Sequence, residues 1–182
     1  MRYFTPERYV TLQDFSSDAA MNAADAAWEQ AVEEYDDYYR SVESALPAEF
    51  RQLQDSYFLN DASVLYLGQH ENRFVIAVRL EPPPHQILHL TYDLAGEARI
   101  NRDALPSVYR DQRTASWLHD EIELVSEHPL LCVHSILFSN GWEVQLPFRA
   151  LQIEEVQALF PAPLNGLAPA GTAAQIETGS AG

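Results

Sequence analysis

The sequence predicts an α+β protein in which N-terminal helices, including one long acidic amphipathic helix, pack on an antiparallel meander sheet. Apolar residues recur at helical spacing up to residue 55, and from residue 57 the pattern changes to an alternation of period two. The 182 residues suit one domain. We expect this domain over 1–160, helical over 5–55, β-rich over 57–153 and closed by a short helix over 154–160, with 161–182 as a flexible tail.

The helical part contains two candidate N-caps, each of which marks the start of a helix. Thr5-Pro6 matches an N-cap followed by a first helical residue, so a short helix to about Gln13 is predicted. Ser16-Ser17-Asp18 offers a second cap, and the stretch to about Ala45 has helical periodicity. The small and apolar residues that recur every three or four positions are Met21, Ala24, Trp28, Ala31, Tyr35, Tyr38, Val42 and Ala45. This spacing predicts one long amphipathic helix. Residues 47–55 then favour a further short helix with Phe50 and Leu53 facing inward.

The second half of the chain is predicted to be a series of strands. Residues 62–68 and 73–80 favour a hairpin across His70-Glu71-Asn72. Residues 86–94 and 116–125 alternate in the same way, and a short strand ends at Ile100. Each segment has apolar residues on one side and polar residues on the other, which is typical of a half-buried antiparallel sheet.

The centre of this sheet is predicted to be a hairpin over 133–148. Asn140-Gly141 suits a two-residue type I′ turn, because both residues tolerate a positive φ. Such a turn would place Leu137 opposite Val144 on an apolar face. It would also turn His134 outward, onto a mixed and partly covered face.

The charge and composition exclude several functions. The formal charge is −16, with 27 acidic against 11 basic residues, and every basic residue is arginine. Without lysine, a P-loop phosphate clamp and Schiff-base chemistry are excluded. So acidic a chain is expected to be repelled by nucleic acid and by anionic membrane surfaces. No glycine-rich nucleotide loop or nucleophile elbow occurs, so no cofactor is predicted and an enzyme is not required.

The expected compartment is the cytoplasm. No apolar run approaches the ~18 residues of a membrane span, and the first residues show no signal-peptide hydrophobic segment. Cys132 is the single cysteine, which excludes an internal disulfide and a cysteine-based zinc cage. Its apolar strand context predicts a buried, inert thiol.

The main functional prediction is that the long helix docks a basic protein partner. Its acidic residues and two neighbouring tyrosines form the expected contact surface, Glu29, Glu33, Glu34, Asp36, Asp37, Tyr38 and Tyr39. The carboxylates would steer the partner and the tyrosines would supply aromatic contact. Two alternatives stay open. The acidity could serve solubility alone, or the carboxylates could copy the phosphate spacing of a nucleic acid.

A rival hypothesis places a small hydrolase or metal site on the outward face of the sheet. It uses His119, His134 and Glu143, which adjacent strands could bring together. Asp120 is a separate candidate, because its phase with Ile122 turns it toward the core. A buried carboxylate requires a partner, for which Arg79 or Arg149 is expected, or else a raised pKa and a general-acid role.

Two short motifs carry a resemblance. The opening Arg2-Tyr3-Phe4-Thr5-Pro6-Glu7, the acidic helix, and Asn60-Asp61-Ala62-Ser63-Val64 resemble a bacterial protein family with a domain of unknown function, over roughly residues 1–155. That family implies no activity. The second motif is also similar to strand entries of small β-rich bacterial proteins, some of them immunity-type, in which histidine often precedes the aspartate. Here Asn60 stands in that place, which weakens a metal role and leaves an interaction role open.

Overall fold

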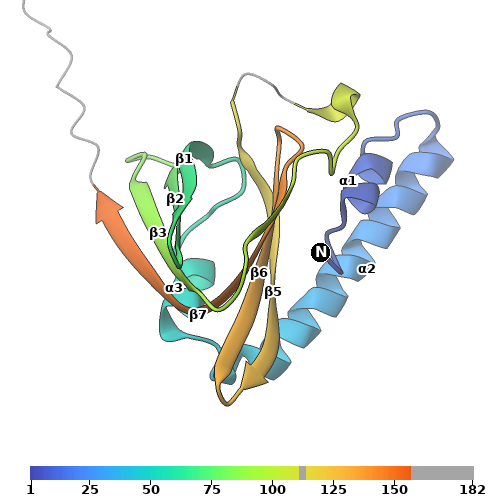
Figure 1. Ribbon diagram of the computed structural model, residues 1–182. Coiled ribbons are helices and arrows are strands. Elements are labelled where there is room, and N and C mark those ends of the chain that lie inside the picture. Colours follow the sequence, from blue (N-terminus) through green and yellow to red (C-terminus); the bar gives the residue numbers. More distant parts are fainter. Residues whose placement is uncertain (111–113, 157–182) are drawn as a thin grey trace, which may run out of the picture.

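The computed structural model describes residues 1–110 and 114–156. Three α-helices come first, with a 3₁₀ turn η1 after the second: α1 (Pro6–Leu12), α2 (Asp18–Val42), η1 (Glu43–Ala45) and α3 (Ala48–Ser56). The strands follow in the order β1 (Ser63–His70), β2 (Arg73–Arg79), β3 (Ile87–Leu94), β4 (Arg99–Asn101), β5 (Trp117–Glu127), β6 (Leu130–Phe138) and β7 (Glu143–Val156), with a 3₁₀ turn η2 (Ser107–Tyr109) between β4 and β5. The α+β class and the antiparallel sheet are therefore confirmed (Figure 1).

The sheet consists of two antiparallel meanders joined through their last strands. Its order is β1-β2-β3-β7-β6-β5, and the short β4 pairs with the start of β7 beyond the end of β3. The long β7 thus pairs with β6 at one end and with β3 at the other. The first and last strands of the order also meet, because Ser63 forms a bridge with Ser116 just before β5. This contact is possible because the sheet is strongly curved (Figure 1).

Local sequence features determine the helix starts. The Thr5 hydroxyl accepts a hydrogen bond from the Arg8 amide (3.3 Å), and Ser17 does the same for Ala20 (3.2 Å). Both are the N-caps that the sequence predicts. Phe50 and Leu53 of α3 are fully buried, also as predicted.

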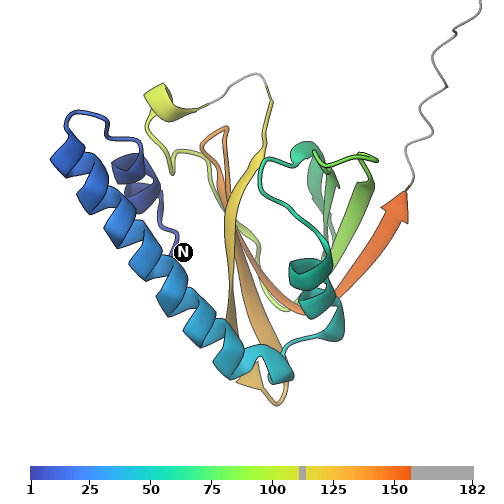
Figure 2. The same cartoon turned by 180° about the vertical axis from the view of Figure 1, so that it is seen from behind.

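The two larger helices cover different parts of the sheet. In Figure 2, α3 lies within the curve of the sheet and α2 runs along its β5 side. α3 fills the concave face, where Phe50 packs edge-on to His134 (4.9 Å) and near Phe148. The tyrosines of α2 cap the free edge of β5: the Tyr35 hydroxyl accepts from the Ile122 amide (3.0 Å) and Tyr38 from Leu124 (2.8 Å). Such cover protects an edge strand from pairing with another chain.

The predicted register of the β6–β7 hairpin is wrong by one residue. Leu137 pairs with Glu143 and Ile136 with Val144, because the loop has three residues instead of two. Within the loop 139–141 only Gly141 has a positive φ (84°), which is typical of a type I turn closed by a G1 bulge. Val144 and Leu146 of β7 therefore face the core as predicted. In β6 the two faces are exchanged, so that Ile136 and His134 lie beside them in place of Leu137 and Ser135. His134 therefore points into the core and is fully buried.

The predicted closing helix over 154–160 is also wrong where it can be compared. Residues 154–156 continue β7 and pair with β3, with Val156 opposite Ile87. Residues 157–160 and the predicted tail over 161–182 lie outside the described residues.

Cys132 is buried as predicted, and burial raises the pKa of its thiol to about 11. Over residues 1–110 and 114–156, no helix is long and apolar enough to cross a membrane.

Candidate functional site

The acidic residues predicted to bind a partner form an exposed surface on α2. Glu29, Glu33, Glu34, Asp36 and Asp37 are all exposed. Asp37 forms an ion pair with Arg40 (3.0 Å), the one basic residue of this helix, and Glu34 accepts from Gln30 (2.8 Å). Exposed pairs of this kind contribute little to stability, so the carboxylates remain available to a partner. We call these five residues the acidic face.

The two tyrosines are placed differently from the carboxylates. Tyr38 is half-buried, stacks on Tyr3 at 5.9 Å and uses its hydroxyl on the edge of β5. Tyr39 is also half-buried, packs 6.3 Å from Tyr35, and burial raises the pKa of its phenol to about 12. Both rings therefore belong mainly to the packing of α2 against the sheet and not to the acidic face.

The register of the hairpin places a polar network in the core. The Nδ1 atom of His134 lies 2.8 Å from the Tyr92 hydroxyl, and its Nε2 atom lies 3.0 Å from Oδ2 of Asp120. Tyr92 and His134 are both fully buried. Both groups are closed to solvent, so Tyr92 positions His134 and His134 in turn positions Asp120.

Asp120 is the least buried member of this network. Its carboxylate also accepts from Trp117 Nε1 (2.8 Å) and Gln54 Nε2 (2.9 Å), and its side chain is 14% exposed. Burial would raise the pKa of the Asp120 carboxyl, but the hydrogen bond and charge interaction with His134, together with the hydrogen bonds from Trp117 and Gln54, outweigh burial and lower that pKa. The inward direction predicted for Asp120 is correct, whereas the predicted partners Arg79 and Arg149 are wrong.

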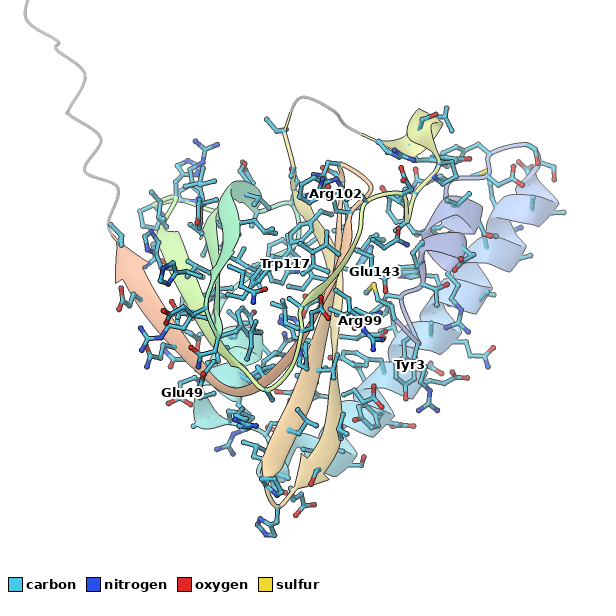
Figure 3. The ribbon with its side chains drawn as sticks, in the orientation of Figure 1. Tyr3, Glu49, Arg99, Arg102, Trp117 and Glu143 are labelled. Atoms are coloured by element: carbon cyan, nitrogen blue, oxygen red, sulfur yellow. The ribbon has the colours of Figure 1, made fainter. Side chains whose placement is uncertain are left out.

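The three residues of the predicted metal site do not come together. His134 faces the concave core, with both ring nitrogens hydrogen-bonded. Glu143 lies toward the N-terminal segment, where the Met1 ammonium contacts it at 2.7 Å (Figure 3). In the described part of the chain, no group of three His, Cys, Asp or Glu residues could hold a metal ion. This geometry gives the metal or hydrolase hypothesis no support.

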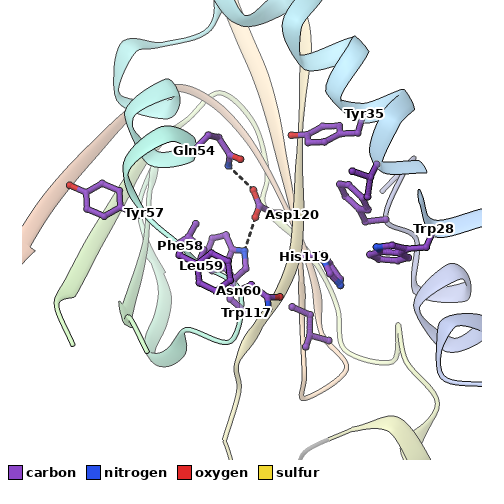
Figure 4. A pocket seen from close by; sticks show the side chains of 13 residues that line it. Trp28, Tyr35, Gln54, Tyr57, Phe58, Leu59, Asn60, Trp117, His119 and Asp120 are labelled. Atoms are coloured by element: carbon purple, nitrogen blue, oxygen red, sulfur yellow. Dashed lines mark hydrogen bonds between the residues drawn. The ribbon is translucent and has the colours of Figure 1, made fainter. Parts of the chain in front are cut away.

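A cleft of about 440 Å³ opens above Asp120, between α2 and α3 (Figure 4). The wall on α2 consists of Trp28, Val32 and Tyr35. The opposite wall comes from α3 and the segment after it, and Trp117–Asp120 form the floor. Phe4 completes the cleft, because the buried Glu121 carboxylate accepts the amides of Arg2, Tyr3 and Phe4 and thereby fixes the N-terminal segment.

His119 lies in the aromatic part of this cleft and not in a metal site. Its ring packs 4.6 Å from Trp28 and 5.8 Å from Phe4. Burial lowers the pKa of His119, partly opposed by the nearby carboxylates of Asp120 and Asp61. Since its ordinary pKa is about 6.5, His119 is neutral at pH 7. The one full charge among the residues lining the cleft is thus the carboxylate of Asp120.

The sequence marks Asp120 by its inward phase but gives no sign of the cleft around it. Gln54 is 66 positions away in the chain, and nothing in the sequence pattern links Trp117 to Asp120. The available signal was the inward phase of Asp120, which requires donors from other elements. Comparisons with known proteins add nothing to these residues, since no protein-family model, no curated protein and no solved structure matches the chain.

Proposed function

We propose that this chain is a non-enzymatic binding or regulatory module of the cytoplasm that docks a basic protein partner. The observation that supports it most is the acidic face, five exposed carboxylates within nine residues of one helix. Like charges at this spacing repel one another and cost helix stability. A basic surface placed against them would relieve that repulsion.

The distance over which exposed charges act also suits a role in binding a partner. Exposed charges act over about 8 Å at physiological ionic strength, so they steer encounter more than they hold a complex. The polar network of Tyr92, His134 and Asp120 offers no route to catalysis, because its inner members are fully buried. A binding role is therefore better supported than an enzymatic one.

The test is affinity capture from the native cells with two baits. The first is the unaltered protein and the second is the fivefold variant E29Q/E33Q/E34Q/D36N/D37N, whose substitutions change charge at exposed positions only. We expect a basic protein that binds the first bait stoichiometrically, is released by salt and is not retained by the second. A partner retained equally by both baits, or no partner at low salt, would contradict the proposal.

A further inference from the structure

We propose that the cleft above Asp120 receives the guanidinium group of an arginine side chain presented by the protein partner. This inference rests on the proposed function and names the group that the docked surface inserts. Its basis is a single fixed carboxylate at the floor of a cleft with aromatic walls, bordered by the acidic face.

The carboxylate of Asp120 retains capacity for one more donor. An ionised carboxylate has about four acceptor positions. Oδ2 accepts from Gln54 and His134, whereas Oδ1 accepts from Trp117 alone. We assign the remaining position on Oδ1 to an N–H of the guanidinium. Because the three present donors hold the carboxylate in place, no reorientation is needed when a ligand binds.

The walls of the cleft suit a flat cation. Trp28 and Tyr35 come from α2, and Tyr57 and Phe58 lie on the opposite side (Figure 4). Aromatic faces attract cations, and a planar, weakly hydrated guanidinium stacks on them. An ammonium group is more strongly hydrated and has no planar face to stack on an aromatic ring. This favours arginine over lysine.

The surroundings of the cleft favour a side chain carried by a protein. Val32 on the α2 wall is 36% exposed, and Phe58 on the opposite wall is 62% exposed, so the rim offers apolar contact area. Glu29 and Asp36 lie three residues before and four residues after Val32, which makes them its neighbours on the helix surface. A basic protein surface would thus meet apolar contacts and carboxylates around the inserted arginine.

The first measurement is an NMR titration with N-acetyl-arginine amide as the probe and N-acetyl-citrulline amide as its neutral isostere. We expect the arginine probe to shift the indole N–H resonances of Trp28 and Trp117 saturably, and the citrulline probe to leave them unchanged. Trp142 is an internal control, because it lies outside the cleft with Arg102 stacked 4.9 Å over its ring. Equal responses to the two probes, or an equal shift at Trp142, would overturn the inference.

Three substitutions separate occupation of the cleft from general attraction. V32K places an ammonium group on the wall of the cleft. V32Q introduces a neutral side chain of similar length at the same position. A27K adds the same charge at an exposed position of α2 that does not line the cleft. We expect V32K to weaken binding of the arginine probe about tenfold or more, and V32Q and A27K to weaken it about twofold or less. Equal weakening by V32K and A27K would overturn the inference.

The partner captured with the unaltered protein completes the test. If the V32K variant captures less of this partner than the A27K variant does, the inference holds. If the partner is captured but the arginine probe gives no response in the cleft, the inference fails and the proposed function stands. If the probe binds but no partner is captured, the arginine does not come from a protein, and both the inference and the proposed function fail.

Discussion

Replacing Tyr92 by phenylalanine tests the polar network in the core without changing its shape. Tyr92 is fully buried, and its hydroxyl lies 2.8 Å from Nδ1 of His134. An ionised Asp120 can only accept, so Nε2 of His134 donates to it. The Tyr92 hydroxyl is then the partner of Nδ1, and phenylalanine cannot replace it, so Y92F would leave that nitrogen buried without a hydrogen bond.

The expected loss follows from this one unmade hydrogen bond. A buried polar atom without a partner costs about 1–3 kcal/mol, and no cavity term is added because the phenyl ring stays. For a chain of this size, each kcal/mol corresponds to a shift in Tm of about 2–4 °C. The free energy of unfolding should fall by about 1–3 kcal/mol, with an unchanged dependence on urea.

Urea unfolding followed by tryptophan fluorescence is the suitable assay. Trp117 is a local probe, because its ring lies 5.7 Å from His134 and its indole N–H donates to Asp120. Y66F is the matched control, since Tyr66 is 57% exposed and a change there should stay within about 0.5 kcal/mol. If Y92F costs no more than Y66F, the hydroxyl does not satisfy His134 and the reasoning is refuted.

Two further predictions concern the side of the sheet covered by α2. Y35F should lower the free energy of unfolding by about 1–3 kcal/mol, because it leaves the Ile122 amide buried without an acceptor. Y38F should lower it less, because the Leu124 amide is only part-buried. Equal losses for the two variants in urea unfolding would contradict this prediction. The folded protein holds the His119 proton less firmly than the unfolded chain, so stability should be lost as the pH falls from about 6.5 toward the lowered pKa of His119. H119F should remove this part of the pH dependence, and a variant whose stability falls as steeply as that of the unaltered protein between pH 7 and 5 would disprove the assignment.

The helices could be predicted from the sequence because their signals are local. Thr5 and Ser17 cap the helices that follow them, and the alternating steps of α2 identify the side that packs inward. What α2 packs against depends on contacts far along the chain. The Tyr35 and Tyr38 hydroxyls reach amides 87 and 86 positions away, and nothing in the helical pattern marks these hydroxyls as caps for a strand edge.

The hairpin register could not be predicted, because both faces of β6 are apolar. Ile136 and Phe138 point to one side and Leu137 to the other, and all three are buried. A one-residue shift therefore leaves apolar side chains on both faces, so alternation does not distinguish the registers. Asn140-Gly141 is the usual signal for a two-residue loop, but Gly141 also suits the left-handed position that closes a three-residue loop. The position of His134, and with it the polar network, depends on this choice.

The same register connects the core to the cleft. A histidine on the outward face would have left Asp120 with Trp117 and Gln54 alone, whereas the inward His134 supplies a third donor to a carboxylate that is only 14% exposed. These hydrogen bonds favour the ionised form, so the charge at the floor of the cleft is maintained by the packing of the core. Since the donors are fixed before any ligand arrives, a cation bound as we propose would gain its interaction with Asp120 without the cost of ordering the carboxylate. In the complex that we propose, the acidic face would act mainly on the rate of encounter and Asp120 on how long the complex lasts.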